Sequence, residues 1–341
     1  MTLPFSASGL RVSSAQRQDM TAVYKDIKPD LERVEKQLES WSAAANPLTA
    51  EVSRYVLRKK GKRLRPALVL LTARLFTSKD EEAVFLASLV ELIHTASLIH
   101  DDIVDKADVR RGAESVHAKW GPNITVLLGD YLYIKSIGLS LESRHARVIR
   151  LLADVSARMI QGELDEYARG GDLDLAEDTY LGIIENKTAV LFAACCQVGA
   201  ILGQASPARE SEAAEYGLNL GLCFQIVDDL LDFTGDERAL GKPVLSDMAE
   251  GRVTLPLIHA LRRDGRPFRD RIAGLVGRRD ITAGQRDELL GLLTAAGSLE
   301  YATAKAAAYA DKAVEALVRF PDSPPRQALA GLARFVLERT K

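Results

Sequence analysis

Two Asp-rich segments, residues 101–105 and residues 228–232, carry the same pattern D-D-x-x-D. Residues four apart on an α-helix lie about 40° apart around its axis, so the outer carboxylates of each motif share one face. Like charges on one face repel each other, whereas a divalent cation that bridges them to phosphate oxygens makes the arrangement favourable. Two such helices facing each other would form a Mg²⁺-dependent clamp for a diphosphate group.

Further polar residues share the helical faces of these carboxylates. His94 lies about 20° from Asp101 around the helix axis, and Asp105 lies about 40° from Asp101. In the second segment, Gln225 lies about 60° from Asp228. A lone histidine on an apolar helix is usually a core residue, but its alignment with two acids favours a role at a site. A solvated face explains one Asp-rich motif well and two motifs on apolar helices poorly.

Basic residues that could bind phosphate occur in four segments. G-K-R-L-R-P covers residues 61–66, R-R-G covers 110–112, N-K-T covers 186–188 and G-K covers 241–242. Arginine offers phosphate oxygens a planar fork of N–H donors, and lysine offers a point charge. Each segment taken alone could equally be a solvated helix end or loop, so only the four segments together indicate phosphate binding.

Composition places the chain among globular proteins. It has 341 residues, 47% hydrophobic and 27% charged, and a net charge of −2 that gives no indication of nucleic-acid binding. The longest apolar run, residues 83–99, is interrupted by Glu91 and His94, which predicts a buried helix and no transmembrane segment. Three cysteines without metal-ligand spacing predict reduced thiols and a cytoplasmic location, namely Cys195, Cys196 and Cys223.

The elements that must position these residues are helices. Helical periodicity and strong helix formers predominate, and strand-like alternation is scarce. Residues 1–20 show no signal peptide and are predicted to be a disordered tail, whereas residues 21–341 are predicted to form a single all-helical domain. Helices are predicted at residues 21–43, 48–60, 65–77, 80–107, 121–142, 144–168, 177–203, 208–234, 252–263, 283–296, 298–319 and 324–340.

The motifs together resemble those of the trans-isoprenyl diphosphate synthases. The ordered set is G-K-R-x-R-P, D-D-x-x-D with R-R-G, K-T, F-Q-x-x-D-D-x-x-D and G-K, all within residues 61–242. The resemblance implies an all-α fold, a single large helical bundle around a deep central cavity, and a homodimer. It also implies that an allylic diphosphate is ionised, that isopentenyl diphosphate attacks the carbocation, and that Mg²⁺ neutralises the departing diphosphate.

The resemblance also implies roles for individual residues. The main Mg²⁺ ligands would be Asp101, Asp105 and Asp228, with support from Asp102, Asp229 and Asp232. Positions that hold the allylic diphosphate or stabilise the cation are matched by Arg110, Lys187, Thr188, Gln225 and Lys242. Positions that bind isopentenyl diphosphate are matched by Lys62, Arg65, His94 and Arg111. Arg252 stands where the family usually has lysine, which keeps the charge and changes the geometry of a diphosphate contact there.

Product length is predicted from the residues just before the first motif. In the family, bulky aromatic residues four and five positions before the motif stop growth at about three or four isoprene units, because they fill the cavity. This chain has Ser97 and Ala96 there, which predicts a long product of on the order of seven to ten units, suited to a quinone side chain and handed to a membrane. The tunnel would be lined by Ile93, Val90 and Leu86. Its floor could be formed by Tyr131, Tyr133, Ile137 or Leu141.

Other functions remain open at this point. A short-chain farnesyl or geranylgeranyl diphosphate synthase could place its plug on a neighbouring helix. A class I terpene cyclase also ionises allylic diphosphates, but its second motif has the form N/D-x-x-S/T-x-x-x-E and it needs no site for isopentenyl diphosphate. A regulatory subunit of a heteromeric synthase would have lost acidic motifs, whereas both are intact here. A purely structural helical protein would need neither motif.

Overall fold

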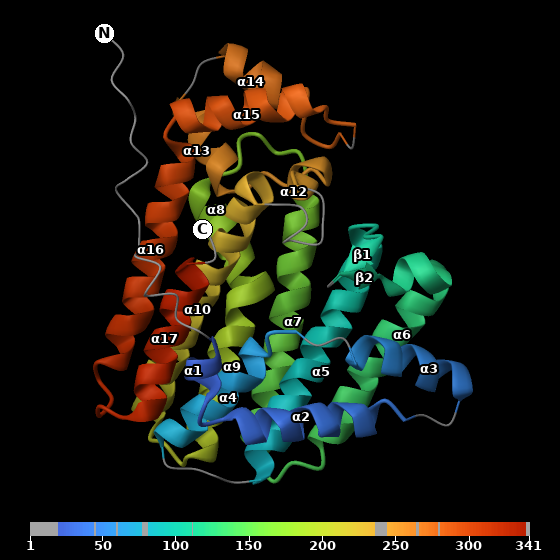
Figure 1. Cartoon of the computed structure of the whole chain (residues 1–341), viewed down its shortest axis with the longest axis vertical. Coiled ribbons are helices and arrows are strands. Elements are labelled where there is room, and N and C mark those ends of the chain that lie inside the picture. Colours follow the sequence, from blue (N-terminus) through green and yellow to red (C-terminus); the bar gives the residue numbers. More distant parts are fainter. Residues whose placement is uncertain are drawn as a thin grey trace.

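Helices make up most of the described chain (Figure 1). The structure is a computed structural model and describes residues 20–43, 46–58, 61–76, 81–110, 112–235, 244–263, 266–278 and 280–338. The N-terminal half contains α1 (Met20–Tyr24), α2 (Lys28–Trp41), α3 (Pro47–Leu57), α4 (Leu64–Leu75), α5 (Glu81–Val104), α6 (Val116–Ser140) and α7 (Ala146–Ala168). The C-terminal half contains α8 (Glu177–Ile184), the π-helix η2 (Glu185–Ala189), α9 (Val190–Leu202), α10 (Pro207–Thr234), α12 (Ser246–Ala249), α13 (Leu255–Arg263), α14 (Arg266–Ala273), α15 (Ala283–Ala295), α16 (Ser298–Leu317) and α17 (Pro324–Glu338).

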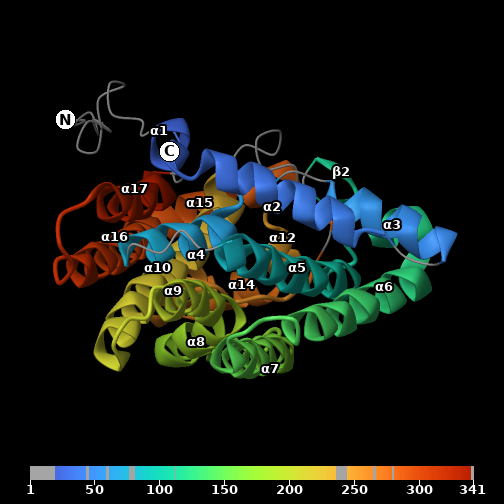
Figure 2. The ribbon, with the colours of Figure 1, turned by 90° about the horizontal axis from the view of Figure 1, so that it is seen from below.

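Helices α4, α5 and α9, which are buried along most of their length, form the centre of the bundle. Helix α4 packs against α5 and α9, and α10 packs against α9 and α16. Figure 1 shows α5, α7, α10 and α16 running along the long axis, with α2 and α3 crossing its lower end. Seen from below, in Figure 2, α6 and α7 lie along one side of the bundle. A helix that is buried along most of its length needs neighbours on several sides, so these helices require a multilayered helical bundle.

Helix α5 is the longest apolar element of the N-terminal half. Its length and composition would suffice to cross a membrane, and so would those of residues Glu177–Leu202. Within the most apolar window of α5, however, 72% of the residues are buried inside the protein. A helix buried to this extent is a core helix. This agrees with the buried helix that was predicted because Glu91 and His94 interrupt the apolar run.

The structure confirms the predicted all-helical fold and corrects several boundaries. The predicted helix 21–43 is two helices, α1 and α2, separated by a turn at residues 25–27. The predicted helix 177–203 is interrupted by η2, and α6 begins at Val116 and is kinked at Gly121, where φ is 80°. Two short helices, α12 and α14, were not predicted. Local sequence patterns do not reveal such boundaries, because tertiary packing decides where a helix is interrupted.

A small antiparallel hairpin follows α5. Its strands are β1 (Val109–Arg110) and β2 (Ala113–Glu114), with Val109 opposite Glu114. Ser115 caps the N-terminus of α6, where its hydroxyl accepts from the backbone N–H of Ala118. The hairpin returns the chain beside the end of α5, so that Arg110 lies next to the first Asp-rich motif.

Candidate active site

Both Asp-rich motifs lie at the C-terminal ends of long central helices. The first occupies the last turn of α5 and the turn after it, and the second occupies the last two turns of α10. A helix C-terminus carries a partial negative charge, so carboxylates are disfavoured there unless cations compensate them. The surroundings of both motifs supply such cations and several hydrogen-bond donors.

The carboxylates of each motif divide into two groups. Asp102, Asp229 and Asp232 are buried and accept hydrogen bonds from neighbouring protein groups. The other three, Asp101, Asp105 and Asp228, are only half-buried. The more accessible group is the one predicted to bind the metal, and carboxylate oxygens with access to solvent and substrate suit a hard divalent cation.

Arg110 compensates the first motif. Its Nε donates to Asp102 Oδ1 at 2.6 Å, and its Nη2 lies 3.7 Å from Asp105 Oδ2. Asp101 retains an unfavourable environment, because burial and then the charge of Glu163 raise its pKa to about 7. The first motif therefore combines a neutralised carboxylate with one that is costly to ionise in the absence of a further cation.

The second motif is held by hydrogen bonds from three segments. Asp229 accepts from the Tyr180 hydroxyl at 2.6 Å and from Gln225 Nε2 at 2.8 Å. Asp232 accepts from Ser246 Oγ at 2.7 Å and from the backbone N–H of Asp247 at 3.0 Å, at the start of α12. Burial and the charge of Asp247 nevertheless raise the pKa of Asp229 to about 7.

Arg252 connects the two acidic regions. Its guanidinium lies 2.8 Å from Asp105 Oδ1 in the first region, 3.7 Å from Glu166 Oε2 on α7 and 3.9 Å from Asp247 Oδ1 beside the second motif. It also pairs with Glu250. Arg252 thus pairs directly with the first motif and with Asp247, whose backbone N–H donates to Asp232 of the second motif. Arg252 stands where the resemblance implies a lysine, and the structure places it among the acids of the site.

Lys187 is paired with two acids that the sequence analysis did not single out. Its Nζ lies 2.8 Å from Glu163 Oε2 and 2.5 Å from Glu166 Oε2, both on α7. The two glutamates are three positions apart in Q-G-E-L-D-E and so share a helical face. Their pattern resembles any solvated acidic face, and only the position of Lys187 in space distinguishes them.

The K-T pair lies within the π-helical segment η2. An extra residue in a helical turn shifts the side chains that follow it, and such segments are frequent at functional sites. Glycines allow η2 to approach both neighbouring helices. A Cβ on Gly162 of α7 would lie 2.4 Å from the Lys187 backbone nitrogen, and one on Gly221 of α10 would lie 2.5 Å from Ala189 Cα. The position of the K-T pair is therefore fixed by backbone packing.

A second basic cluster lies at the start of α4. Arg65 Nη1 is 2.9 Å from His94 Nε2, and its guanidinium carbon lies 4.8 Å from the centre of the Phe192 ring. Lys62 Nζ lies 5.2 Å from the centre of the Phe335 ring, on α17. The structure thus brings Arg65 and His94 together, although they lie on different helices.

Arg63, between the two predicted ligands, has a structural role. It is buried, and its guanidinium binds Glu35 of α2 and Glu91 of α5 at 2.6 Å each. Its backbone is left-handed, with φ at 50°. A fully paired buried arginine can fix a backbone conformation that a non-glycine residue otherwise adopts rarely. We infer that Arg63 orients the segment that carries Lys62 and the start of α4, where Arg65 lies. Arg111 and Lys242 lie outside the described residues.

The interior face of α5 below Asp101 is lined by small and aliphatic residues. Ala96 is buried and Ser97 is half-buried, and the deeper positions Ile93, Val90 and Leu86 are all buried. Among the residues considered for the tunnel floor, Ile137 and Leu141 are 56% and 71% exposed, so they face away from the interior of this chain. Tyr131 and Tyr133 are half-buried, and Tyr133 stacks on His100 with the ring centres 5.8 Å apart.

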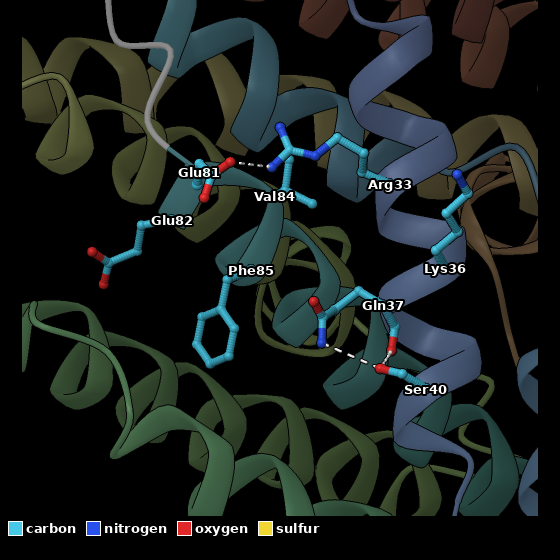
Figure 3. Close-up of a pocket in the computed structure, with 8 residues that line it drawn as sticks. All are labelled: Arg33, Lys36, Gln37, Ser40, Glu81, Glu82, Val84 and Phe85. Atoms are coloured by element: carbon cyan, nitrogen blue, oxygen red, sulfur yellow. Dashed lines mark hydrogen bonds and ion pairs between the residues drawn. The ribbon is translucent and has the colours of Figure 1, made fainter.

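A surface hollow of about 560 Å³ lies at the opposite end of α5, between α5 and α2 (Figure 3). Its lining includes Arg33, Gln37 and Phe85, and Phe85 lies sixteen residues before Asp101. At 1.5 Å per residue, this places the hollow about 24 Å from the first motif along the helix. Among the described residues, no three acidic, histidine or cysteine side chains are already gathered as a metal cage.

Known proteins resemble this chain in sequence. Residues 46–293 match the family model described as polyprenyl synthetase. The octaprenyl diphosphate synthase of Haemophilus influenzae is 34% identical over 330 residues, covering 95% of this chain and 99% of the relative. The octaprenyl diphosphate synthase of Escherichia coli is also 34% identical, covering 97% of this chain and 99% of the relative.

Solved structures show the same fold. A polyprenyl synthase from Caulobacter crescentus, complexed with calcium and isoprenyl diphosphate, has a TM-score of 0.90 and 35% identity, covering 95% of this chain and 98% of that chain. A decaprenyl diphosphate synthase from Rhodobacter capsulatus has a TM-score of 0.89 and 35% identity, covering 95% of this chain and 100% of that chain.

Proposed function

Because this chain belongs to the polyprenyl synthetase family, we propose that it condenses an allylic diphosphate with successive isopentenyl diphosphate units to give a long-chain all-trans polyprenyl diphosphate. The observation that carries the proposal is that Arg252 pairs with Asp105 of the first motif and with Asp247, which is hydrogen-bonded to Asp232 of the second motif, while Arg110 and Lys187 pair with further acids of the site. An acidic and basic site of this kind suits a metal–diphosphate group.

Asp101, Asp105 and Asp228 are the residues that would hold Mg²⁺, since carboxylate oxygens are of the type this cation prefers and the three residues are only half-buried. Bound Mg²⁺ would supply neutralisation of the negative charge that develops on the departing diphosphate. The carboxylates Asp102 and Asp232 would keep the two helix ends in place through their protein partners.

The two basic clusters would bind the two substrates. We assign the allylic diphosphate to Arg110, Lys187 and Lys242, with Thr188 and Gln225 beside its reacting carbon. We assign isopentenyl diphosphate to Lys62, Arg65, His94 and Arg111. The contact between Arg65 and His94 supports one shared subsite for the second group. The second substrate attacks the carbon from which the diphosphate departs, so no protein nucleophile is needed. Correct placement of both substrates would supply much of the rate acceleration.

A long product is supported by the interior of α5 and by the relatives. The small side chains of Ala96 and Ser97 leave no aromatic plug at that depth. Relatives include solanesyl diphosphate synthase 1 of Arabidopsis thaliana and component 2 of the heptaprenyl diphosphate synthase of Geobacillus stearothermophilus, both 35% identical. A short-chain isoprenyl diphosphate synthase of Methanothermobacter thermautotrophicus is 36% identical, so overall identity alone does not decide product length.

We also propose that the protein is a cytoplasmic homodimer that hands its product to a membrane. Large apolar side chains lie exposed on α6, at its C-cap and on α7, namely Leu127, Ile134, Ile137, Leu141, Ile160 and Leu164. Several large apolar side chains exposed on neighbouring helices suit an interaction surface, and a symmetric pair of chains would cover them. Sedimentation of the purified protein tests the assembly, and Ile134→Asp is expected to weaken it.

The activity is tested by incubation with Mg²⁺, farnesyl diphosphate and labelled isopentenyl diphosphate, followed by chromatography of the dephosphorylated products. The expected result is a series that ends at a long polyprenol. Asp228→Asn serves as the inactive control. A product that stops at farnesol or geranylgeraniol with excess isopentenyl diphosphate would refute the long-chain assignment, and absence of any condensation would refute the proposed activity.

A further inference from the structure

A chain of hydrogen bonds connects the second Asp-rich motif to the K-T segment. The Tyr180 hydroxyl donates to Asp229 Oδ2 at 2.6 Å, and Gln225 Nε2 donates to Asp229 Oδ1 at 2.8 Å. Thr188 Oγ1 donates in turn to Gln225 Oε1 at 2.7 Å. Tyr180, Thr188 and Asp229 are 4%, 7% and 4% exposed, so water has little access to these bonds. These hydrogen bonds join α8, η2 and α10, and the bonded residues lie up to 49 positions apart in the sequence.

The bonds in this chain can run in only one direction. A side-chain amide nitrogen can only donate and its carbonyl oxygen can only accept, so Gln225 donates to Asp229 and accepts from Thr188. The amide nitrogen of Gln225 therefore faces Asp229, and its carbonyl oxygen faces Thr188. The hydroxyl hydrogen of Thr188 is used in its bond to that oxygen. At the end of this hydrogen-bond chain away from Asp229, the Gln225 carbonyl oxygen and the Thr188 hydroxyl oxygen keep free lone pairs.

We propose that Tyr180 and Asp229 are positioning residues that fix the polarity of Gln225 and Thr188, so that oxygen lone pairs face the allylic carbon as it becomes positive. This inference rests on the proposed function, which places Gln225 and Thr188 beside that carbon. Dipoles already oriented toward a developing charge stabilise the transition state without reorganisation. Tyr180 itself contacts neither substrate. Its hydroxyl keeps the second oxygen of Asp229 occupied, which holds the carboxylate in the orientation that accepts from Gln225.

The test compares two tyrosines in the same protein. Tyr180→Phe removes only the hydroxyl that binds Asp229. Tyr216→Phe is the matched control, because its hydroxyl is equally buried and donates to the Leu329 carbonyl at 2.7 Å, outside the site. Both variants are expected to lose similar thermal stability. Only Tyr180→Phe is expected to lower kcat, by about tenfold, with KM for both substrates unchanged, because the polarity of the site acts on the transition state.

A double-mutant cycle separates positioning from a general loss of packing. If Tyr180 acts through Gln225, Tyr180→Phe lowers kcat in the wild-type background and has no further effect in the Gln225→Ala background. Three results would overturn the inference: full kcat in Tyr180→Phe, an equal loss in Tyr216→Phe, or the same additional loss in both backgrounds. Wild-type turnover is measured first, so a failure of the proposed activity is recognised separately from a failure of the positioning role.

Discussion

Replacing Asp101 with asparagine should stabilise the metal-free protein. The Asp101 carboxylate lies in the last turn of α5, where the helix carries partial negative charge. Burial and Glu163 raise its pKa to about 7, and the nearby Asp105 acts in the same direction. Ionising Asp101 in the folded protein is thus costly, although the proposed function requires its carboxylate. Asparagine at this position would keep the shape of the side chain and remove the charge.

The magnitude and the pH window follow from that pKa. The folded value of about 7 lies above the unfolded value of 3.8. The folded state therefore binds more protons between these values, and the contribution of Asp101 to the free energy of unfolding falls as the pH rises through that interval. This difference in pKa corresponds to at most about 4 kcal/mol of unfolding free energy. Because the half-buried carboxylate contacts solvent, we expect Asp101→Asn to gain about 2 kcal/mol.

The assay is urea unfolding in the presence of a chelator at about pH 5 and about pH 8, since these values fall within and above the window. Asp101→Asn should gain stability relative to the wild type mainly at the higher pH. Asp311→Asn is the control, because Asp311 is an exposed acid on α16, remote from the site. A gain that is equal at both values of pH, or a loss at the higher pH, would show that the strain assigned to Asp101 is absent.

Other substitutions test the remaining assignments. Asp228→Ala should lower turnover by about three orders of magnitude or more with the fold intact on circular dichroism, because it removes a ligand of the metal that neutralises the leaving group. Lys62→Ala should raise KM for isopentenyl diphosphate more than for the allylic substrate, and Lys187→Ala should do the reverse; equal effects in steady-state kinetics would contradict the two subsites. Ser97→Tyr should shorten the product to about three or four units by filling the interior below the site, which product chromatography would detect. Gly162→Ala should lower kcat, because its Cβ would meet the Lys187 backbone nitrogen at 2.4 Å, and unchanged turnover would mean that η2 moves freely.

Much of the fold could be predicted because its signals are local. The helices that contain the Asp-rich motifs are long and apolar, and their predicted ends at residues 107 and 234 agree closely with the observed Val104 and Thr234. The π-helix η2 was missed because its cause lies elsewhere in the chain. Gly162 and Gly221 provide the space for it from two other helices. A single glycine in a helical pattern does not indicate which segment it will accommodate.

The site could be predicted only as far as its motifs extend. The Asp-rich motifs and the basic segments are each readable from residue type and spacing. Glu163, Arg63 and Tyr180 were not found, since each acts through a residue at least 24 positions away. Nothing in the local sequence distinguishes them from a solvated acid, a surface arginine or a core tyrosine. Their roles depend on contacts that the tertiary fold creates.

The ion pairs of the site explain how so many acids can share it. Lys187 neutralises Glu163 and Glu166, and Arg252 lies between Asp105 and Asp247. A buried carboxylate without a counter-ion would cost several kcal/mol, so the fold depends on these cations. Under the proposed function, Lys187 and Arg252 would also be available to diphosphate oxygens, because their groups bind carboxylate and phosphate alike. Arginine at position 252 suits both kinds of partner with its planar fork, and its two terminal nitrogens reach Asp105 and Asp247 separately. The arginine that stands where the resemblance implies a lysine is therefore part of the ion-pair network beside the first motif.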